Sequence, residues 1–233
     1  MTVHFIHVAK CGGTALRFAI RQAQEEGGPI ESPWGPLSAH PGHRFTLADV
    51  PEGDKAFLAF RDPVSRFVSG FYSRLRKGRP RYFREWSDDE RKAFGWFETP
   101  EELADALGDG WRQRRRAEFA MRSIRQLRRP MTKWAGRPAF FRENLDKVLY
   151  VARQETLDED WKRLQELLHI PRHVLLPQDD RGAHRTNYPH ETAIGERGRE
   201  AIARWYTEDY ELLEIADGLR DGRFGPSAAP AAD

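Results

Sequence analysis

The chain has little cysteine and no long hydrophobic stretch. Its single cysteine, Cys11, excludes an intrachain disulfide and suits a reducing compartment. No apolar run approaches the length of a membrane-spanning helix, and the amino terminus leads directly into a strand-like segment. The formal net charge is only +2, so overall charge favours no class of partner. We therefore expect a cytoplasmic protein with no membrane partner, and the preference for arginine over lysine fits a GC-rich bacterial genome.

Length and composition favour one folded domain. A chain of 233 residues can bury a sizeable core without dividing into several domains, and it contains no internal repeat. We expect the domain to span residues 1–224. A disordered tail should follow at residues 225–233, where small residues and proline predominate.

The amino-terminal segment predicts a strand, a tight turn and the start of a helix. An apolar run at residues 3–9 leads into Lys10, Cys11, Gly12, Gly13, Thr14 and Ala15. Such a junction directs backbone N–H groups and the positive end of a helix dipole toward one point, where an anion can bind. The two glycines allow close approach to a phosphate, Lys10 adds a charge, and Thr14 can cap the helix. A Walker A loop has its lysine after the glycines, so the ordinary ATP or GTP loop does not fit.

A second segment combines a buried strand with a capped helix. Residues 55–60 form the apolar run, and Arg61 follows it at the carboxyl end, where α/β sheets bind ligands. Asp62 is a good N-cap and Pro63 a good first helical residue. Ser69 lies on a different helix face from the apolar positions. A guanidinium with a nearby serine hydroxyl suits a phosphate monoester.

Together these segments resemble the sulfotransferases that use 3′-phosphoadenosine-5′-phosphosulfate (PAPS). The likeness is greatest to the carbohydrate branch that contains the heparan sulfate 2-O-sulfotransferases and small bacterial relatives. That family has a PKxGGT-like loop for the 5′-phosphosulfate and an RDPxxRxxS segment for the 3′-phosphate. Here these segments read AKCGGT at residues 9–14 and RDPVSRFVS at residues 61–69. The resemblance covers both ends of the chain, whereas residues 78–140 match no pattern.

The resemblance implies a P-loop-like nucleotide-binding sulfotransferase fold, with PAPS as donor, 3′-phosphoadenosine 5′-phosphate (PAP) as product and no metal. Lys10 would stabilise the charge that develops on the leaving phosphate oxygen. A late Arg-Thr-Asn sequence at residues 185–187 is similar to a nucleotide-contacting loop of the family. The donor-binding residues implied in this way are Lys10, Cys11, Gly12, Gly13, Thr14, Ala15, Arg61, Ser69, Arg185 and Asn187.

The long connection at residues 29–54 contains the candidates for the general base. An acceptor hydroxyl must lose a proton as it attacks, and histidine is a usual proton acceptor. The resembled 2-O-sulfotransferases carry their proposed base in a G-H-x-x-F-like segment at this place, and here His43 fits that pattern. His40 is the alternative candidate for the base. The simpler interpretation is that both histidines are surface residues of a loop.

The other histidines favour structural roles. His4 and His7 lie on the first predicted strand and are expected to be packed or edge residues. His169 and His173 have a spacing compatible with a metal site. Pro171 interrupts any helix between them, and no third ligand is evident, so we expect no metal there.

Strands separated by helices predict an α/β fold with a central parallel sheet covered by helices on both faces. Residues 177–192 should form a polar loop. The expected strands are 3–9, 55–60 and 147–152, and the expected helices are 13–26, 63–77, 101–107, 112–129, 157–168 and 193–218.

Residues 111–129 contain eight arginines and one acid, Glu118. A solvated face of an amphipathic helix, a groove for an anionic acceptor and a nucleic-acid contact all fit this pattern. A nucleic-acid-binding module would leave both phosphate-binding segments unexplained, and a phosphotransferase would need the GxxxxGK loop that is missing. The sequence leaves open the oligomeric state and the acceptor, which could be a small molecule or a saccharide with a free hydroxyl.

Overall fold

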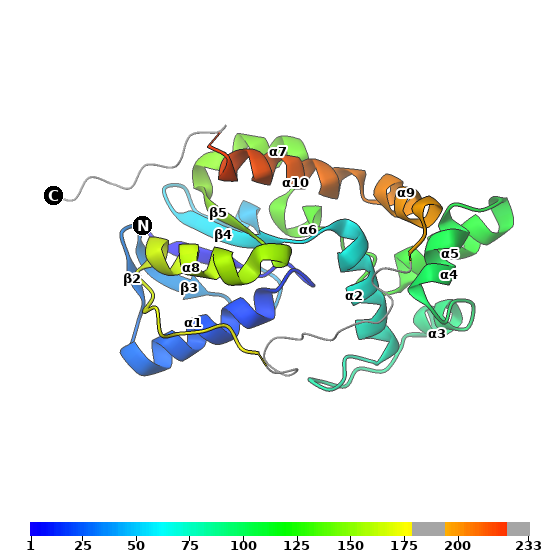
Figure 1. Cartoon of the computed structure of the whole chain (residues 1–233), viewed down its shortest axis with the longest axis horizontal. Coiled ribbons are helices and arrows are strands. Elements are labelled where there is room, and N and C mark those ends of the chain that lie inside the picture. The colour runs from blue at the N-terminus through cyan, green and yellow to red at the C-terminus, as the bar shows by residue number, and fades with distance from the viewer. Residues whose placement is uncertain (179–193, 223–233) are drawn as a thin grey trace. The chain divides into compact units, whose positions relative to one another are not determined.

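The computed structural model describes residues 1–178 and 194–222 (Figure 1). Its contacts group the chain into two compact units. The sheet unit comprises Met1–Arg61, Met131–Arg185 and Glu211–Asp233, and the helical unit comprises Asp62–Pro130 and Thr186–Tyr210. The predicted tail at 225–233 lies outside the described residues. No helix in the described part of the chain has the length and apolar character that crossing a membrane requires.

The sheet unit is built on five strands in the order β2-β3-β1-β4-β5. Strands β3, β1, β4 and β5 are parallel neighbours, and the short β2 pairs antiparallel with β3. This arrangement confirms the predicted α/β class with a mainly parallel sheet flanked by helices. The strands are β1 (Val3–Ile6), β2 (Glu31–Ser32), β3 (Gly35–Ala39), β4 (Lys55–Phe60) and β5 (Val148–Arg153).

Two of these strands lie where the sequence predicts only a connection. β2 and β3 fall within residues 29–54, and their glycine, proline and serine are poor strand formers. Parallel pairing of β3 with β1 gives this segment its strand conformation, so tertiary contact outweighs local preference. The first strand is also shorter than expected, because the chain turns after Ile6.

Helices of the sheet unit follow the predicted boundaries closely. α1 (Gly13–Gly27) buries its small and aliphatic residues, and α8 (Leu157–Leu168) packs against β5. Three short 3-10 turns and two short helices complete the connections: η1 (Leu47–Asp49), α6 (Thr132–Ala135), α7 (Pro138–Glu143), η2 (Leu145–Lys147) and η3 (Gln154–Thr156).

The predicted final helix is in fact two helices. α9 (Glu196–Trp205) ends at Tyr206, where the backbone leaves the helical conformation, and α10 (Thr207–Arg220) begins directly after it. The buried Tyr206 hydroxyl donates to the Leu127 carbonyl at 2.7 Å. The side chain at the junction is therefore anchored by a tertiary hydrogen bond that a helical periodicity does not reveal.

The helical unit contains α2 (Pro63–Leu75), α3 (Asp88–Phe94), α4 (Pro100–Leu107) and α5 (Trp111–Ser123). α2 begins as predicted, with the Asp62 carboxylate accepting from the Ser65 N–H at 2.9 Å and Pro63 in the first turn. The basic helix ends at Ser123 rather than at residue 129, because Ile124 takes an extended conformation and is buried. The α5 arginines are exposed, whereas Ala117, Ala120 and Met121 are buried, as expected of an amphipathic helix.

A buried ion pair connects α2 with α3 in this unit. The Arg74 guanidinium donates to both carboxylate oxygens of Glu90 at 2.7 Å, and both side chains are almost fully buried. Glu90 also accepts from the backbone N–H groups of Ser87 and Arg125. Burial raises the pKa of Glu90, but these hydrogen bonds outweigh burial and hold the pKa below its usual range.

We predict that Glu90→Gln lowers the free energy of unfolding by about 3 kcal/mol, because Arg74 would keep a buried charge without its partner. The folded-state pKa of Glu90 is lowered, so its contribution is complete above the unfolded value of about 4.3 and disappears as the pH falls through the folded value. Urea denaturation of both proteins between pH 7 and pH 3 measures this difference.

Glu85→Gln is the matched control, because it removes an exposed ion pair with Lys77 in the same unit. Such pairs contribute little to stability. An equal decrease in the free energy of unfolding in the two variants would show that burial does not make the Arg74–Glu90 pair more stabilising than an exposed pair.

Candidate functional site

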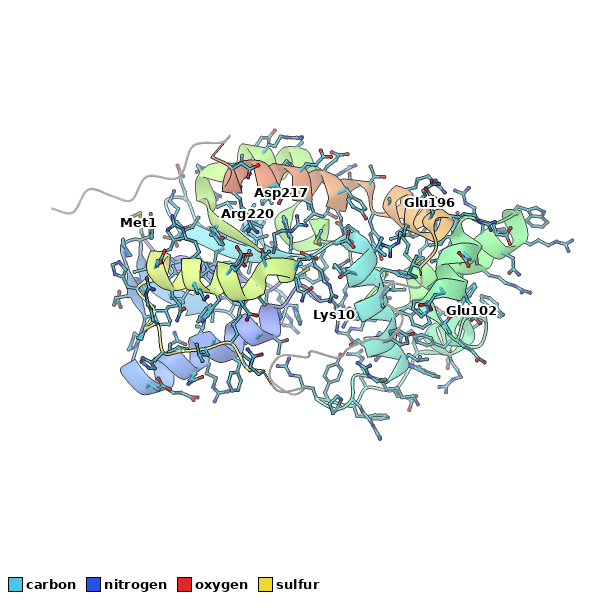
Figure 2. The ribbon with its side chains drawn as sticks, viewed as in Figure 1. Met1, Lys10, Glu102, Glu196, Asp217 and Arg220 are labelled. Carbon is cyan, nitrogen blue, oxygen red and sulfur yellow. The ribbon has the colours of Figure 1, made fainter. Side chains whose placement is uncertain are left out.

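The turn between β1 and α1 has the geometry of an anion-binding loop. Lys10 and Gly12 both adopt left-handed backbone conformations, with φ of 69° and 80° (Figure 2 labels Lys10). Gly12 is the N-cap of α1, and its carbonyl accepts from the N–H groups of Ala15 and Leu16. Thr14 is the second helical residue, so its predicted capping role is wrong. A strained non-glycine residue beside a helix N-terminus is typical of a functional site.

Both glycines of this loop lie against side chains of the sheet unit. A Cβ at Gly13 would come within 2.2 Å of the His7 imidazole, and one at Gly12 within 2.7 Å of the Leu157 side chain. Any larger residue would displace these neighbours. The side chain of Cys11 is fully buried, with its Sγ 3.6 Å from the Ala9 carbonyl oxygen, so only the backbone of Cys11 can face a ligand.

His43 lies directly beside this loop. Its ring centroid is 4.0 Å from that of His7, and its Nδ1 is 2.9 Å from the His7 carbonyl oxygen. Because a carbonyl only accepts, Nδ1 carries the proton and Nε2 carries the lone pair of the neutral ring. Trp134 Nε1 donates to the His43 carbonyl at 3.0 Å and fixes the backbone. His43 therefore presents a defined proton acceptor at Nε2.

His40 belongs to a different hydrogen-bonded chain. Asp54 accepts from the Thr2 N–H and lies 3.0 Å from His4 Nε2, and His4 Nδ1 lies 2.9 Å from His40 Nε2. The His40 ring stacks on Phe45 with centroids 3.7 Å apart. Burial and the neighbouring His4 lower the pKa of His40. His4 and His7 are buried as expected, and the Nε2 of His40 is engaged by His4.

Arg17 on α1 connects the anion-binding loop with the histidine-bearing segment. Its Nη2 donates to the carbonyls of His40 at 2.6 Å and Gly42 at 2.8 Å. The helix that begins at Gly13 thus holds the backbone on either side of Pro41. Sequence analysis missed Arg17 and Asp54, because nothing local distinguishes them from surface residues.

Arg61 follows β4 at the same sheet edge as the anion-binding loop. β1 and β4 are adjacent parallel strands with Ile6 opposite Leu58, so their carboxyl ends lie at one edge. Ser69 belongs to α2 in the helical unit, where it is buried at 4 % exposure. Arg185, Thr186 and Asn187 lie outside the described residues, so their predicted contacts stay predictions.

Arg66, which also falls within the second motif, takes part in a buried network of the helical unit. It forms an ion pair with Asp209 at 3.7 Å, donates to the Arg129 carbonyl and lies 6.0 Å from the centre of the Tyr206 ring. Arg66 and Asp209 are 2 % and 0 % exposed. These contacts assign Arg66 to packing rather than to ligand binding.

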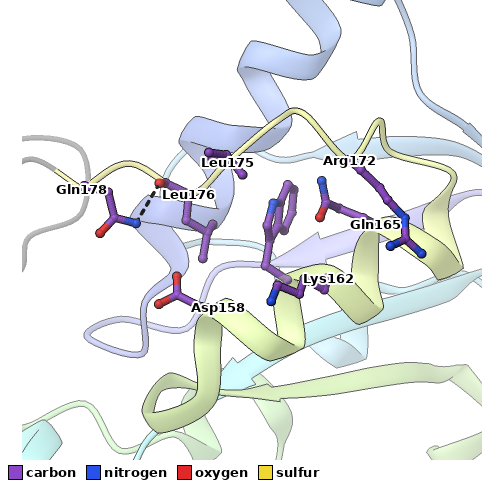
Figure 3. Close-up of a pocket in the computed structure, with 8 residues that line it drawn as sticks. Asp158, Lys162, Gln165, Arg172, Leu175, Leu176 and Gln178 are labelled. Atoms are coloured by element: carbon purple, nitrogen blue, oxygen red, sulfur yellow. Dashed lines mark hydrogen bonds between the residues drawn. The ribbon is translucent and has the colours of Figure 1, made fainter.

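A cavity of about 250 Å³ lies elsewhere in the sheet unit, beside α8 (Figure 3). Its wall includes the segment after α8, which Trp161 and Gln165 hold by hydrogen bonds to the Val174 carbonyl. The lining residues are Asp158, Trp161, Lys162, Gln165, Arg172, Leu175, Leu176 and Gln178, none of which sequence analysis selected. Among the described residues, no group of three or more histidine, cysteine, aspartate or glutamate side chains could hold a metal ion.

Comparison with known proteins gives one match. The model of a family described as the sulfotransferase family matches residues 3–215. A search of curated proteins and a search of solved structures each found no significant match.

Proposed function

From the premise that this chain belongs to the sulfotransferase family, we propose that it transfers a sulfuryl group from PAPS to an acceptor hydroxyl. The observation that carries the proposal is the pairing of the strained loop at Lys10 and Gly12 with the oriented imidazole of His43. One feature can bind an anionic leaving group, and the other can accept a proton. The match to a sulfotransferase family supports this reading over a phosphotransferase or a nucleic-acid-binding module.

The loop residues fit the 5′-phosphosulfate of such a donor. The left-handed Gly12 and the side-chain-free Gly13 open the first turn of α1, where a phosphate can approach the backbone and the positive end of the helix dipole. When bound, PAPS would supply the sulfuryl group together with a phosphate that leaves. Lys10 would stabilise the negative charge that develops on the leaving oxygen as the S–O bond breaks.

His43 would act as the general base of the transfer. Its Nε2 would accept the acceptor's proton while the acceptor oxygen forms its bond to sulfur. Arg61 and Ser69 would bind the 3′-phosphate, as the RDPVSRFVS segment implies. The likeness of the His43 segment to 2-O-sulfotransferases favours a sugar hydroxyl as acceptor.

A direct test incubates the pure protein with labelled PAPS and a panel of sugars, phenols and small alcohols, and detects the added sulfuryl group by mass spectrometry.

We predict that Lys10→Ala lowers turnover about 100-fold or more while PAP affinity changes less, because its partner charge appears in the transition state. Lys92→Ala, on the exposed face of α3, is the matched control. A collapse of PAP affinity with turnover preserved at saturation would make Lys10 a binding residue only.

We predict that PAP raises the melting temperature more than AMP does. A ligand that binds the folded state stabilises it by mass action, and AMP offers no 3′-phosphate to Arg61 and Ser69. Arg61→Ala should reduce the PAP shift to the size of the AMP shift. Equal shifts from the two nucleotides in the wild-type protein would contradict the 3′-phosphate assignment.

We predict that His43→Ala lowers turnover by about 100- to 10,000-fold and leaves PAP binding intact. The wild-type rate should rise with pH as the imidazole loses its proton, because only the neutral ring accepts a proton. Rate profiles from pH 5 to pH 9 should lose this limb in the variant. His40→Ala is the comparison: if it alone removes the limb, His40 is the base, and if neither does, the base lies within residues 78–140.

A further inference from the structure

Four arginines gather in the helical unit outside the site described above. They are Arg84, which precedes α3, and Arg125, Arg128 and Arg129, which follow α5. Burial lowers the pKa of Arg125 and of Arg129, and the charges of the other arginines lower it further. The Arg74–Glu90 ion pair also contacts the backbone of both Arg84 and Arg125, so these two residues lie near each other, and Arg128 and Arg129 follow Arg125 closely along the chain. These four residues are here called the arginine cluster.

No carboxylate among the described residues forms an ion pair with any member of the arginine cluster. Glu90, which accepts from the Arg125 N–H, is already bound in a bidentate pair with Arg74, whose charge also acts on Arg125. Glu85 pairs with Lys77. Two arginines of α5 differ, because Arg114 and Arg122 share the carboxylate of Glu118. None of the four members of the arginine cluster is therefore neutralised by a carboxylate among the described residues.

Buried polar contacts fix the backbone that carries the arginine cluster. Arg74 donates to the Arg84 carbonyl at 3.2 Å, and Glu90 accepts from the Arg125 N–H at 3.0 Å. The buried Arg66 donates to the Arg129 carbonyl. Because like charges held together raise the energy of the free protein, a bound anion would recover that energy. These contacts hold the backbone of Arg84, Arg125 and Arg129 in place and so limit how far the positive charges can move apart.

We propose that the arginine cluster binds an anionic group, a sulfate, phosphate or carboxylate, carried by the acceptor. Guanidiniums suit such oxyanions, because their paired N–H groups match two oxygens at once. Two exposed aromatic residues, Tyr82 and Phe83, precede Arg84 at 44 % and 56 % exposure and can stack on a sugar ring. That the anion belongs to an acceptor rests on the proposed sulfotransferase function.

The test compares two double variants of equal charge change. Arg125→Gln/Arg129→Gln alters the arginine cluster, and Arg112→Gln/Arg115→Gln alters exposed positions of α5. Binding of dextran sulfate, with neutral dextran as the blank, is measured by isothermal titration at low and moderate salt. We expect the cluster variant to lose about tenfold or more in affinity and the α5 variant less than about threefold, because charge-assisted contacts exceed diffuse attraction. If the first cluster variant is unstable, dextran sulfate affinity is measured instead with Arg84→Gln/Arg128→Gln, which changes only exposed side chains of the cluster.

Acceptor kinetics complete the test. For an anionic sugar acceptor, the cluster variant should raise KM with little change in kcat, and PAP affinity should stay unchanged. Equal loss of dextran sulfate binding in the cluster and α5 variants would overturn the proposal in favour of a diffuse basic surface. A loss of PAP affinity would assign the cluster to the donor, and tighter, cluster-dependent binding of a DNA oligonucleotide would assign it to nucleic acid. Absence of any sulfuryl transfer by the wild-type protein would refute the proposed function, whereas the dextran sulfate result would still decide whether the cluster binds anions.

Discussion

The close approach of Gly13 to the His7 imidazole determines how the start of α1 lies against the carboxyl end of β1. Only a residue without a side chain fits there, so α1 can begin directly against the end of β1. The same His7 offers its carbonyl oxygen to His43 Nδ1, and the two ring centroids lie 4.0 Å apart with the rings tilted by 49°. One residue thus connects the anion-binding loop with the imidazole that would accept the acceptor's proton.

Arg17 strengthens this connection from the helix side. Its guanidinium binds two carbonyls of the histidine-bearing segment, so a shift of α1 would also move that segment. General base catalysis depends on distances within hydrogen-bond reach, which favours a base held by several contacts over one on a loose loop. The left-handed conformation of Lys10 costs conformational free energy, which the packing of neighbouring residues offsets.

In the helical unit, buried arginines hold the backbone in place in a similar way. Two buried arginines, Arg66 and Arg74, are neutralised by Asp209 and Glu90 and use their remaining N–H groups to hold backbone carbonyls. The arginine cluster at the surface is left without such partners among the described residues. The two buried arginines stabilise the fold, whereas the arginine cluster is the proposed site for an anion.

The sequence by itself determined the parts that local chemistry controls. The AKCGGT turn predicted an anion-binding loop, Asp62 and Pro63 predicted the start of α2, and apolar periodicity predicted the α/β class. Only the tertiary structure decided the strands β2 and β3, the division of the last helix at Tyr206 and the hydrogen bond that sets the tautomer of His43. Strand pairing, side-chain anchoring and tautomer selection depend on partners far away along the chain, which local patterns do not encode.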